Sequence, residues 1–181
     1  PGAVRLATVG SGRPCLVVVA PRRRPGRVSA CRLVRERALG LGRCELTVVA
    51  AAAVRDASDG GEFCADVLRE TGLRIWVIDG EEEARLSAQV VLLCWPGAYG
   101  LVCDIGGSSM ELAEISGGRV GRRVTSQLGP LKLRDLKGGA KGRHAHIKEV
   151  ITGLQEKMGN QRDRLFLVGG SWRAIARIDM S

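Results

Sequence analysis

From Glu45 onward, β-prone and helix-prone segments alternate regularly, and this alternation is the strongest constraint on the fold. Residues 46–50 form a short β-prone run, and residues 62–70 carry apolar side chains at helical spacing. A second β-prone run at 73–78 follows Gly72, which fits a helix C-cap, and residues 81–93 predict a helix with three carboxylates in its first turn. This order predicts a layered α/β fold rather than an all-helical one.

The alternation resumes after Trp95-Pro96-Gly97, which breaks the pattern and is the predicted domain boundary. Ser116-Gly117-Gly118 is a good hairpin turn between two of the strands that follow. We therefore expect part of one α/β domain at residues 45–98 and part of a second at 99–181. The later predicted elements are strands at 101–104, 110–115, 119–124 and 165–168 and helices at 144–158 and from Ser171 to Arg177.

The positive charge is concentrated at the start of the chain. The net charge is +9, and the first 45 residues hold 10 Arg against 2 Glu. The stripe Arg22, Arg23, Arg24 and Arg27 could bind polyanions, but both Phe residues and the single Tyr lie beyond residue 60. We therefore interpret residues 1–44 as an atypical basic N-terminal segment, solvated or poorly ordered, with no specific nucleic-acid partner.

Composition indicates a packed, soluble, cytoplasmic protein. Hydrophobic residues make up 45% of the 181 residues and charged residues 26%, which argues against disorder. The apolar stretch 15–20 is too short for a membrane span or a signal peptide. The six cysteines form no CxxC pair, and His144 and His146 lie far from them, so reduced thiols are favoured over a zinc site. Because residue 1 is Pro, we expect a fragment of a longer protein.

The segment from Asp104 to Glu111 carries the strongest chemical signal. Asp104 ends an apolar run and is followed by Gly106, Gly107, Ser108 and Ser109. A turn of this kind can point backbone N–H groups at a phosphate while a carboxylate holds Mg²⁺. A plain hairpin turn has a similar sequence, so both interpretations stay open. Asp104 favours the phosphate interpretation, because an acid ending a buried strand needs a partner or a cation.

Gly169-Gly170-Ser171 repeats the order of strand, glycine and helix. The N-terminus of the following helix could receive an anion or the edge of a nucleotide. A plain helix start with Ser171 as N-cap is an equally good interpretation of these residues alone.

Two further charged groups also have two interpretations each. Glu81, Glu82 and Glu83 either form a solvated first helical turn or direct one of the three carboxylates at a target, because consecutive helical residues point about 100° apart. Arg55 follows a buried strand and either clamps a phosphate or pairs with Asp56 or Asp59.

Together these segments resemble, in order and spacing, the exopolyphosphatase / guanosine pentaphosphate phosphohydrolase (Ppx/GppA) family over roughly residues 30–180. The resemblance implies an actin-like ATPase (ribonuclease-H-like) fold with two α/β domains, both incomplete here. It implies Mg²⁺-dependent release of terminal phosphate from polyphosphate or guanosine pentaphosphate, and a possible homodimer in the full-length relative. The blocks that carry it are residues 48–57, 77–86, 104–112, 128–131 and 167–174.

By position, the resemblance assigns Glu83 as the catalytic glutamate that activates water, Asp104 and Glu111 as metal and phosphate-loop acids, and Arg55 as a basic residue of the same cleft. The phosphate-binding positions would be Gly106, Gly107, Ser108, Ser109, Gly169, Gly170 and Ser171.

This chain also departs from the family pattern. The family's first phosphate loop has an Asp and an Asn, and both are missing from Val9-Gly10-Ser11-Gly12. In the second loop, Ser108 replaces the usual third glycine and Met110 replaces the usual Ser or Thr. Asp59 stands where the family often has Asn. We therefore expect a weakly active or inactive form. Two alternatives remain: an actin-like-fold kinase or ATPase, and a non-catalytic remnant that binds polyanions or nucleotides.

Overall fold

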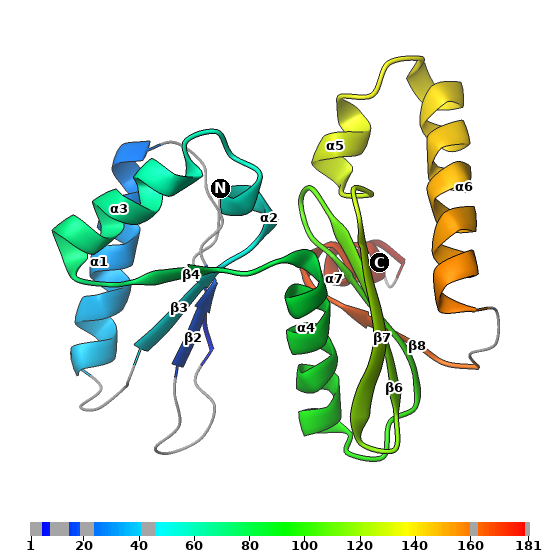
Figure 1. Ribbon diagram of the computed structural model, residues 1–181, viewed down its shortest axis with the longest axis horizontal. Coiled ribbons are helices and arrows are strands. Elements are labelled where there is room, and N and C mark those ends of the chain that lie inside the picture. Colours follow the sequence, from blue (N-terminus) through cyan, green and yellow to red (C-terminus); the bar gives the residue numbers. More distant parts are fainter. Residues whose placement is uncertain (1–4, 8–14, 19–23, 41–45, 160–162, 180–181) are drawn as a thin grey trace. The chain divides into compact units, whose positions relative to one another are not determined.

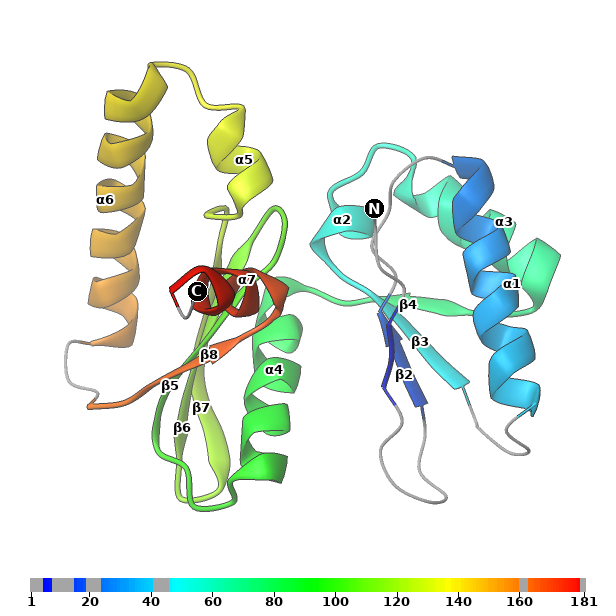
Figure 2. The same cartoon turned by 180° about the vertical axis from the view of Figure 1, so that it is seen from behind.

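The computed structural model describes residues 5–7, 15–18, 24–40, 46–159 and 163–179. The chain forms two compact units, Pro1–Asp79 and Gly80–Ser181. Each unit has its own four-stranded sheet with helices packed on it (Figures 1 and 2). The expected two-part α/β organisation is therefore present.

The sheet of the first unit has the order β1-β2-β3-β4. β1 pairs with β2 in antiparallel fashion, while β2, β3 and β4 are parallel neighbours. Phe63 and Val67 of α3 pack with Val48 and Ile75 of the sheet in the core. The elements are β1 (Arg5–Ala7), β2 (Cys15–Val18), α1 (Arg24–Gly40), β3 (Leu46–Ala50), α2 (Ala52–Arg55), α3 (Gly60–Thr71) and β4 (Ile75–Val77).

Helix α1 corrects the interpretation of residues 1–44 as a basic arm separate from the first domain. Val28, Cys31 and Val34 recur at three-residue spacing and so share one helical face, and Cys31 and Val34 are buried in the core of the first unit. β2 also pairs in parallel with β3. This apolar face anchors the segment despite its arginines. Arg22 and Arg23 lie outside the described residues, as do residues 9–12.

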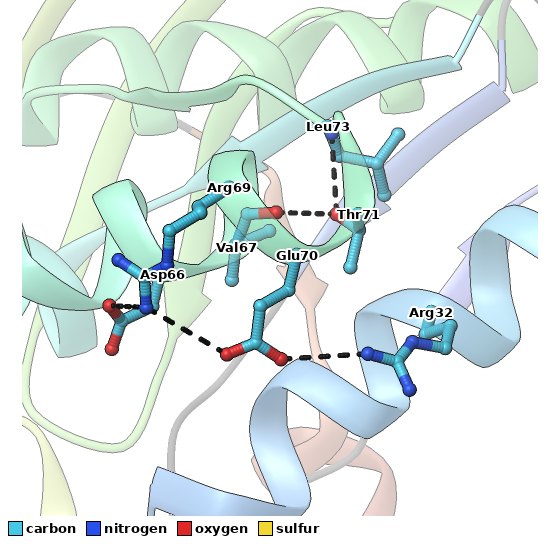
Figure 3. Close-up of polar contacts among 7 residues, drawn as sticks. All are labelled: Arg32, Asp66, Val67, Arg69, Glu70, Thr71 and Leu73. Atoms are coloured by element: carbon cyan, nitrogen blue, oxygen red, sulfur yellow. Dashed lines mark hydrogen bonds and ion pairs between the residues drawn. The ribbon is translucent and has the colours of Figure 1, made fainter.

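The C-terminus of α3 is fixed by the hydroxyl of Thr71, whose two hydrogen bonds Figure 3 shows, and by a glycine. Thr71 Oγ1 donates to the carbonyl of Val67 at 2.6 Å and accepts from the Leu73 N–H at 3.2 Å. Gly72 has φ +70°, the left-handed conformation expected for a helix C-cap. Beside it, Arg32 of α1 pairs with Glu70 of α3 at 3.5 Å, which ties the two helices together at the surface.

The sheet of the second unit has the order β7-β6-β5-β8. β5, β6 and β7 form an antiparallel meander, and β8 adds in parallel to β5. α4 covers one face, while α5 and α6 lie against the other (Figure 1). The elements are α4 (Gly80–Cys94), β5 (Gly100–Ile105), β6 (Met110–Ser116), β7 (Arg119–Ser126), α5 (Pro130–Arg134), α6 (Gly139–Met158), β8 (Leu165–Val168) and α7 (Gly170–Asp179).

Helix α4 belongs to the second unit, so the boundary expected near residue 98 is corrected to residues 79 and 80. Ala84 and Ala88 are almost completely buried, and they pack with Val102, Ala113 and Ile115 of the sheet. Small side chains on this face let the helix approach the strands closely. The break at Trp95-Pro96-Gly97 is therefore a loop within a unit.

Cys31, Cys64, Cys94 and Cys103 have free thiols; Cys31 and Cys103 are buried and Cys94 is exposed. Burial raises the pKa of the Cys103 thiol to about 11, so it stays protonated at neutral pH. Among the described residues, no helix combines the length and the apolar character needed to cross a membrane.

Candidate functional site

The glycine-rich segment after β5 is the turn of a β-hairpin. Ile105 pairs with Met110 across the two strands, and the Gly106 N–H donates to the Ser109 carbonyl at 3.0 Å. Within the described part of the chain, the N–H groups of Gly107 and Ser108 donate no backbone hydrogen bond. The hairpin interpretation is therefore correct, and the same turn leaves two neighbouring N–H donors for a ligand.

The segment before α5 packs against the backbone of this turn. A Cβ built on Gly129 would lie 2.2 to 2.4 Å from backbone atoms of Ser108, so only a glycine permits this approach. The Leu131 N–H donates to the Gly107 carbonyl at 2.8 Å. The start of α5 thus fixes the backbone of the turn from the side of its carbonyls.

Two carboxylates stand opposite each other at the end of this hairpin. Asp104 on β5 pairs in register with Glu111 on β6. Glu111 is 1% exposed, and its Oε1 accepts a hydrogen bond from Thr125 Oγ1 on β7 at 3.0 Å. Its Oε2 is buried and accepts no hydrogen bond from the described residues. A buried carboxylate oxygen in this condition calls for a proton or a cation.

Burial disfavours the charged forms of both acids, and nearby negative charges add to this effect at Glu111. Desolvation raises the pKa of Glu111 to about 7, and the negative charges of Glu83 and Asp104 act in the same direction. The hydroxyls of Ser109 and Thr125 oppose this shift, although only Thr125 has full hydrogen-bond geometry.

Desolvation also raises the pKa of Asp104, and the hydrogen bond from Ser87 Oγ to Asp104 Oδ2, at 2.6 Å, opposes it. Without a cation, the two strands therefore hold an acid pair that resists full ionisation.

Helix α4 brings a third acid to the pair. A Cβ on Gly80 would lie 2.5 Å from Cβ of Thr125, so the first turn of α4 sits directly on β7. Glu83 and Ser87 are four residues apart and share a helical face, and Ser87 reaches Asp104. Glu83 Oε2 is buried, and the charge of Glu83 acts on Glu111.

The other two acids of this turn have different surroundings. Glu81 is exposed, and Glu82 forms a bidentate ion pair with Arg85 at 2.5 and 2.7 Å. The geometry therefore singles out Glu83 among the three glutamates. We call Glu83, Asp104 and Glu111 the acid cluster.

The Gly169-Gly170 turn adjoins this cluster. Gly169 has φ +104°, and a Cβ there would lie 2.6 Å from Asp104 Oδ1. α7 begins at Gly170, so Ser171 lies inside the helix and the interpretation of Ser171 as its N-cap is not supported. Asp104 is thus flanked by Ser87 on one carboxylate oxygen and by Gly169 at the other.

Arg55 lies in the first unit and pairs with Asp56, as the ion-pair interpretation predicted. Its Nη1 donates to the Ile78 carbonyl at 2.9 Å, and its Nε lies 3.4 Å from Asp56 Oδ1. Both contacts are structural, and its part in a phosphate cleft stays a prediction.

The residues present fit a magnesium ion that completes its coordination with other ligands. No group of three or more His, Cys, Asp or Glu side chains in the described ranges could hold a metal by itself. Mg²⁺ is commonly bound by one or two carboxylates together with waters and substrate phosphates. Asp104 and Glu111 supply two such carboxylates, and Glu111 Oε2 is a buried oxygen that a cation would satisfy.

Sequence reasoning missed the residues that support the cluster, namely Gly80, Ser87, Thr125 and Gly129. Ser87 had a usable signal, because it stands one turn after Glu83 on a predicted helix. The close approaches of Gly80 and Gly129 join distant segments, and no local pattern marks such contacts.

Comparison with known proteins places this chain in a family. The model of the Ppx/GppA phosphatase family matches residues 18–180. The structure of the Aquifex aeolicus PPX-GPPA enzyme is similar with a TM-score of 0.69 at 23% identity, covering 84% of this chain and 53% of that one. The exopolyphosphatase from Cytophaga hutchinsonii is similar with a TM-score of 0.74 at 20% identity, again covering 84% and 53%.

The chain therefore spans about half the length of these relatives. The likeness confirms the expected α/β fold of the actin-like class. Because the family model covers most of the chain, the chain belongs to the Ppx/GppA phosphatase family.

Proposed function

We propose that this chain carries the acidic part of a phosphoanhydride hydrolase that releases terminal phosphate from inorganic polyphosphate or guanosine pentaphosphate with Mg²⁺. The observation that carries the proposal is the acid cluster beside the hairpin turn, with Glu83, Asp104 and Glu111 converging from three elements. Membership of the family supports the same reaction class. By itself the chain would hydrolyse these substrates slowly, since it spans about half the length of its relatives.

In this proposal Glu83 is the general base. Its carboxylate removes a proton from the attacking water, for which it must stand within about 3 Å of that water. The charge of Glu83 acts on Glu111, so the carboxylate of Glu83 lies close to the two strand acids. The Gly169-Gly170-Ser171 segment would contact the phosphates from another element of the same unit.

The turn and the two strand acids position the phosphoryl group. The N–H groups of Gly107 and Ser108 would donate to its oxygens, with Gly129 holding the backbone in place. Asp104 and Glu111 would hold Mg²⁺, which when bound neutralises charge on the transferring phosphoryl group. Ser87 and Thr125 orient these two carboxylates through their hydroxyls.

The proposal is tested by orthophosphate release from long-chain polyphosphate and from guanosine pentaphosphate with Mg²⁺, using the Cytophaga hutchinsonii exopolyphosphatase as the positive control. We expect weak Mg²⁺-dependent release that Glu83→Gln lowers by about a hundredfold or more, the usual contribution of a general base. Glu81→Gln is the matched control and should have no effect, since Glu81 is exposed.

Metal binding gives a second readout that does not need turnover. Mn²⁺ should broaden the backbone amide signals of Gly107 and Ser108, and Asp104→Ala should abolish this broadening. A chain that neither releases phosphate nor binds metal in an Asp104-dependent way would refute the proposal and leave a non-catalytic member of the family.

A further inference from the structure

A basic groove lies between α4 and β7. It has a volume of about 660 Å³, and its eight lining residues in the described part include three arginines and no Asp or Glu. Arg85 and Gln89 come from α4, and Arg119 and Arg123 come from β7. We call these residues, with Leu92 and Val120 between them, the arginine groove.

Two of the three arginines have their charge available. Arg85 is held by Glu82 through its Nε and Nη2. Arg119 and Arg123 form no ion pair with any residue that the structure describes. The hydrogen bond from Arg85 is the main cause that lowers the pKa of Glu82, and the charge of Arg123 acts in the same direction, so Arg123 stands near the Glu82–Arg85 pair. The groove therefore keeps two net positive charges after its internal pair is counted.

An irregularity in β7 places Arg123 on the α4 side. Ala113 pairs with Arg123 and Ile115 pairs with Val120, so β7 has one more residue than β6 over this stretch. This β-bulge reverses the usual alternation, and it lets Val120 pack under α4 while Arg123 also lines the groove. Bulges of this kind redirect a side chain at the cost of ladder pairing, which suits a binding surface.

The groove begins close to the candidate site. Thr125, which holds Glu111, is two residues along β7 from Arg123, and the paired Glu82 adjoins Glu83 on α4. From there the groove extends to Gly118 in the turn before β7. A ligand long enough to reach from the acid cluster along β7 would meet Arg123 first and Arg119 second.

From this arrangement we infer that the arginine groove binds the trailing part of a long inorganic polyphosphate chain whose terminal phosphate lies at the acid cluster. The inference rests on the proposed function and selects long-chain polyphosphate over guanosine pentaphosphate as the substrate class. Guanidinium groups bind phosphate oxygens in bidentate fashion and stay charged at all relevant pH values. The groove has no aromatic lining residue on which a base could stack, so a nucleic acid or a nucleotide base is disfavoured.

The test compares the double variant Arg119→Gln/Arg123→Gln with the double variant Lys141→Gln/Lys148→Gln, which removes the same charge from exposed positions on α6. Binding of long-chain polyphosphate, tripolyphosphate and a single-stranded oligonucleotide is measured at several salt concentrations with Mg²⁺. Backbone amide spectra of each variant check that the fold is kept, and they locate each ligand.

We expect the groove variant to weaken long-chain polyphosphate binding by about tenfold and to lower the salt slope of log Kd by about 2, one for each lost contact. Tripolyphosphate is too short to use the groove, so its binding should not change. Long-chain polyphosphate should shift the amide signals of Arg119 and Arg123, and the α6 control should change its affinity much less.

Four results would contradict part of this picture, and they are distinguishable. Equal losses of polyphosphate affinity in the groove and control variants would refute polyphosphate binding at the arginine groove. The same conclusion would follow if the oligonucleotide bound as tightly as polyphosphate and lost as much affinity in the groove variant. Amide shifts by tripolyphosphate at Gly107 and Ser108 without any groove effect would overturn the groove and keep the proposed function. Groove shifts without any response at Gly107 and Ser108 would overturn the proposed function and leave a polyphosphate-binding surface.

Discussion

Replacing Glu111 by Gln tests the electrostatics of the acid cluster without needing turnover. Glu111 is 1% exposed, and burial together with the charge of Glu83 raises its pKa from 4.5 to about 7. Gln keeps the shape of the side chain and cannot ionise. The hydrogen bond from Thr125 to the retained carbonyl oxygen also remains possible.

The sign of the effect follows from proton linkage. Between pH 4.5 and 7 the folded chain binds the Glu111 proton while the unfolded chain releases it, so the folded state loses stability as pH rises. A shift of this size corresponds to about 3 kcal/mol, at about 1.4 kcal/mol per pKa unit. Glu111→Gln removes this loss. We therefore expect the variant to gain about 3 kcal/mol over the natural chain between pH 4 and pH 8.

Urea unfolding at pH 4 and pH 8 measures this difference, with β-sheet signals of the second unit as the probe because the chain has two units. Glu81→Gln removes the same charge at an exposed position and is the control. Mg²⁺ should reduce the difference at pH 8, since a cation stabilises the ionised form of Glu111. A Glu111→Gln variant with the same pH dependence of unfolding as the natural chain would refute the raised pKa.

Two further substitutions test the supports of the cluster. Gly129→Ala should destabilise the second unit by roughly 2 kcal/mol or more and shift the Ser108 amide signal, because the new Cβ would lie within 2.4 Å of three Ser108 backbone atoms. Gly97→Ala is the control, because a Cβ at Gly97 meets nothing within 4 Å. Thermal unfolding of this control should give a stability within about 0.5 kcal/mol of the natural chain. Ser87→Ala should raise the pKa of Asp104 further, because Asp104 loses the hydrogen bond that now lowers it; carboxylate NMR titration checks this, and an unchanged or lowered pKa would contradict it.

Much of the secondary structure was predictable because the chain encodes it locally. The strand predicted at 46–50 is β3, and Gly72 caps α3 with the positive φ that only glycine adopts readily. The Ser116-Gly117-Gly118 hairpin also formed, with φ +55° at Gly117 and +72° at Gly118. At the cap and at the hairpin, a glycine fixes the backbone at its own position, so the sequence alone is enough to predict these two features.

What could not be predicted depends on contacts between distant segments. Trp95-Pro96-Gly97 has a strong breaking signal, yet the boundary lies before α4, because the small residues Ala84 and Ala88 pack on strands that come later in the chain. The arginine-rich start of the chain concealed the apolar spacing of α1 for a similar reason. Composition reports an average, whereas packing depends on which residues share one face.

The place of α4 also decides how rigidly the acid cluster is held. Glu83 is on α4, and Asp104 and Glu111 are on the sheet that α4 covers, so all three acids belong to one compact unit. The contacts of Gly80 with Thr125 and of Ser87 with Asp104 fix the helix at two points about two turns apart. A domain boundary after α4 would have left Glu83 free to move relative to the two strand acids. Because the boundary precedes α4, the repulsion between Glu83 and Glu111 is built into the packed unit itself, and a cation at Glu111 would relieve it without any rearrangement of the fold.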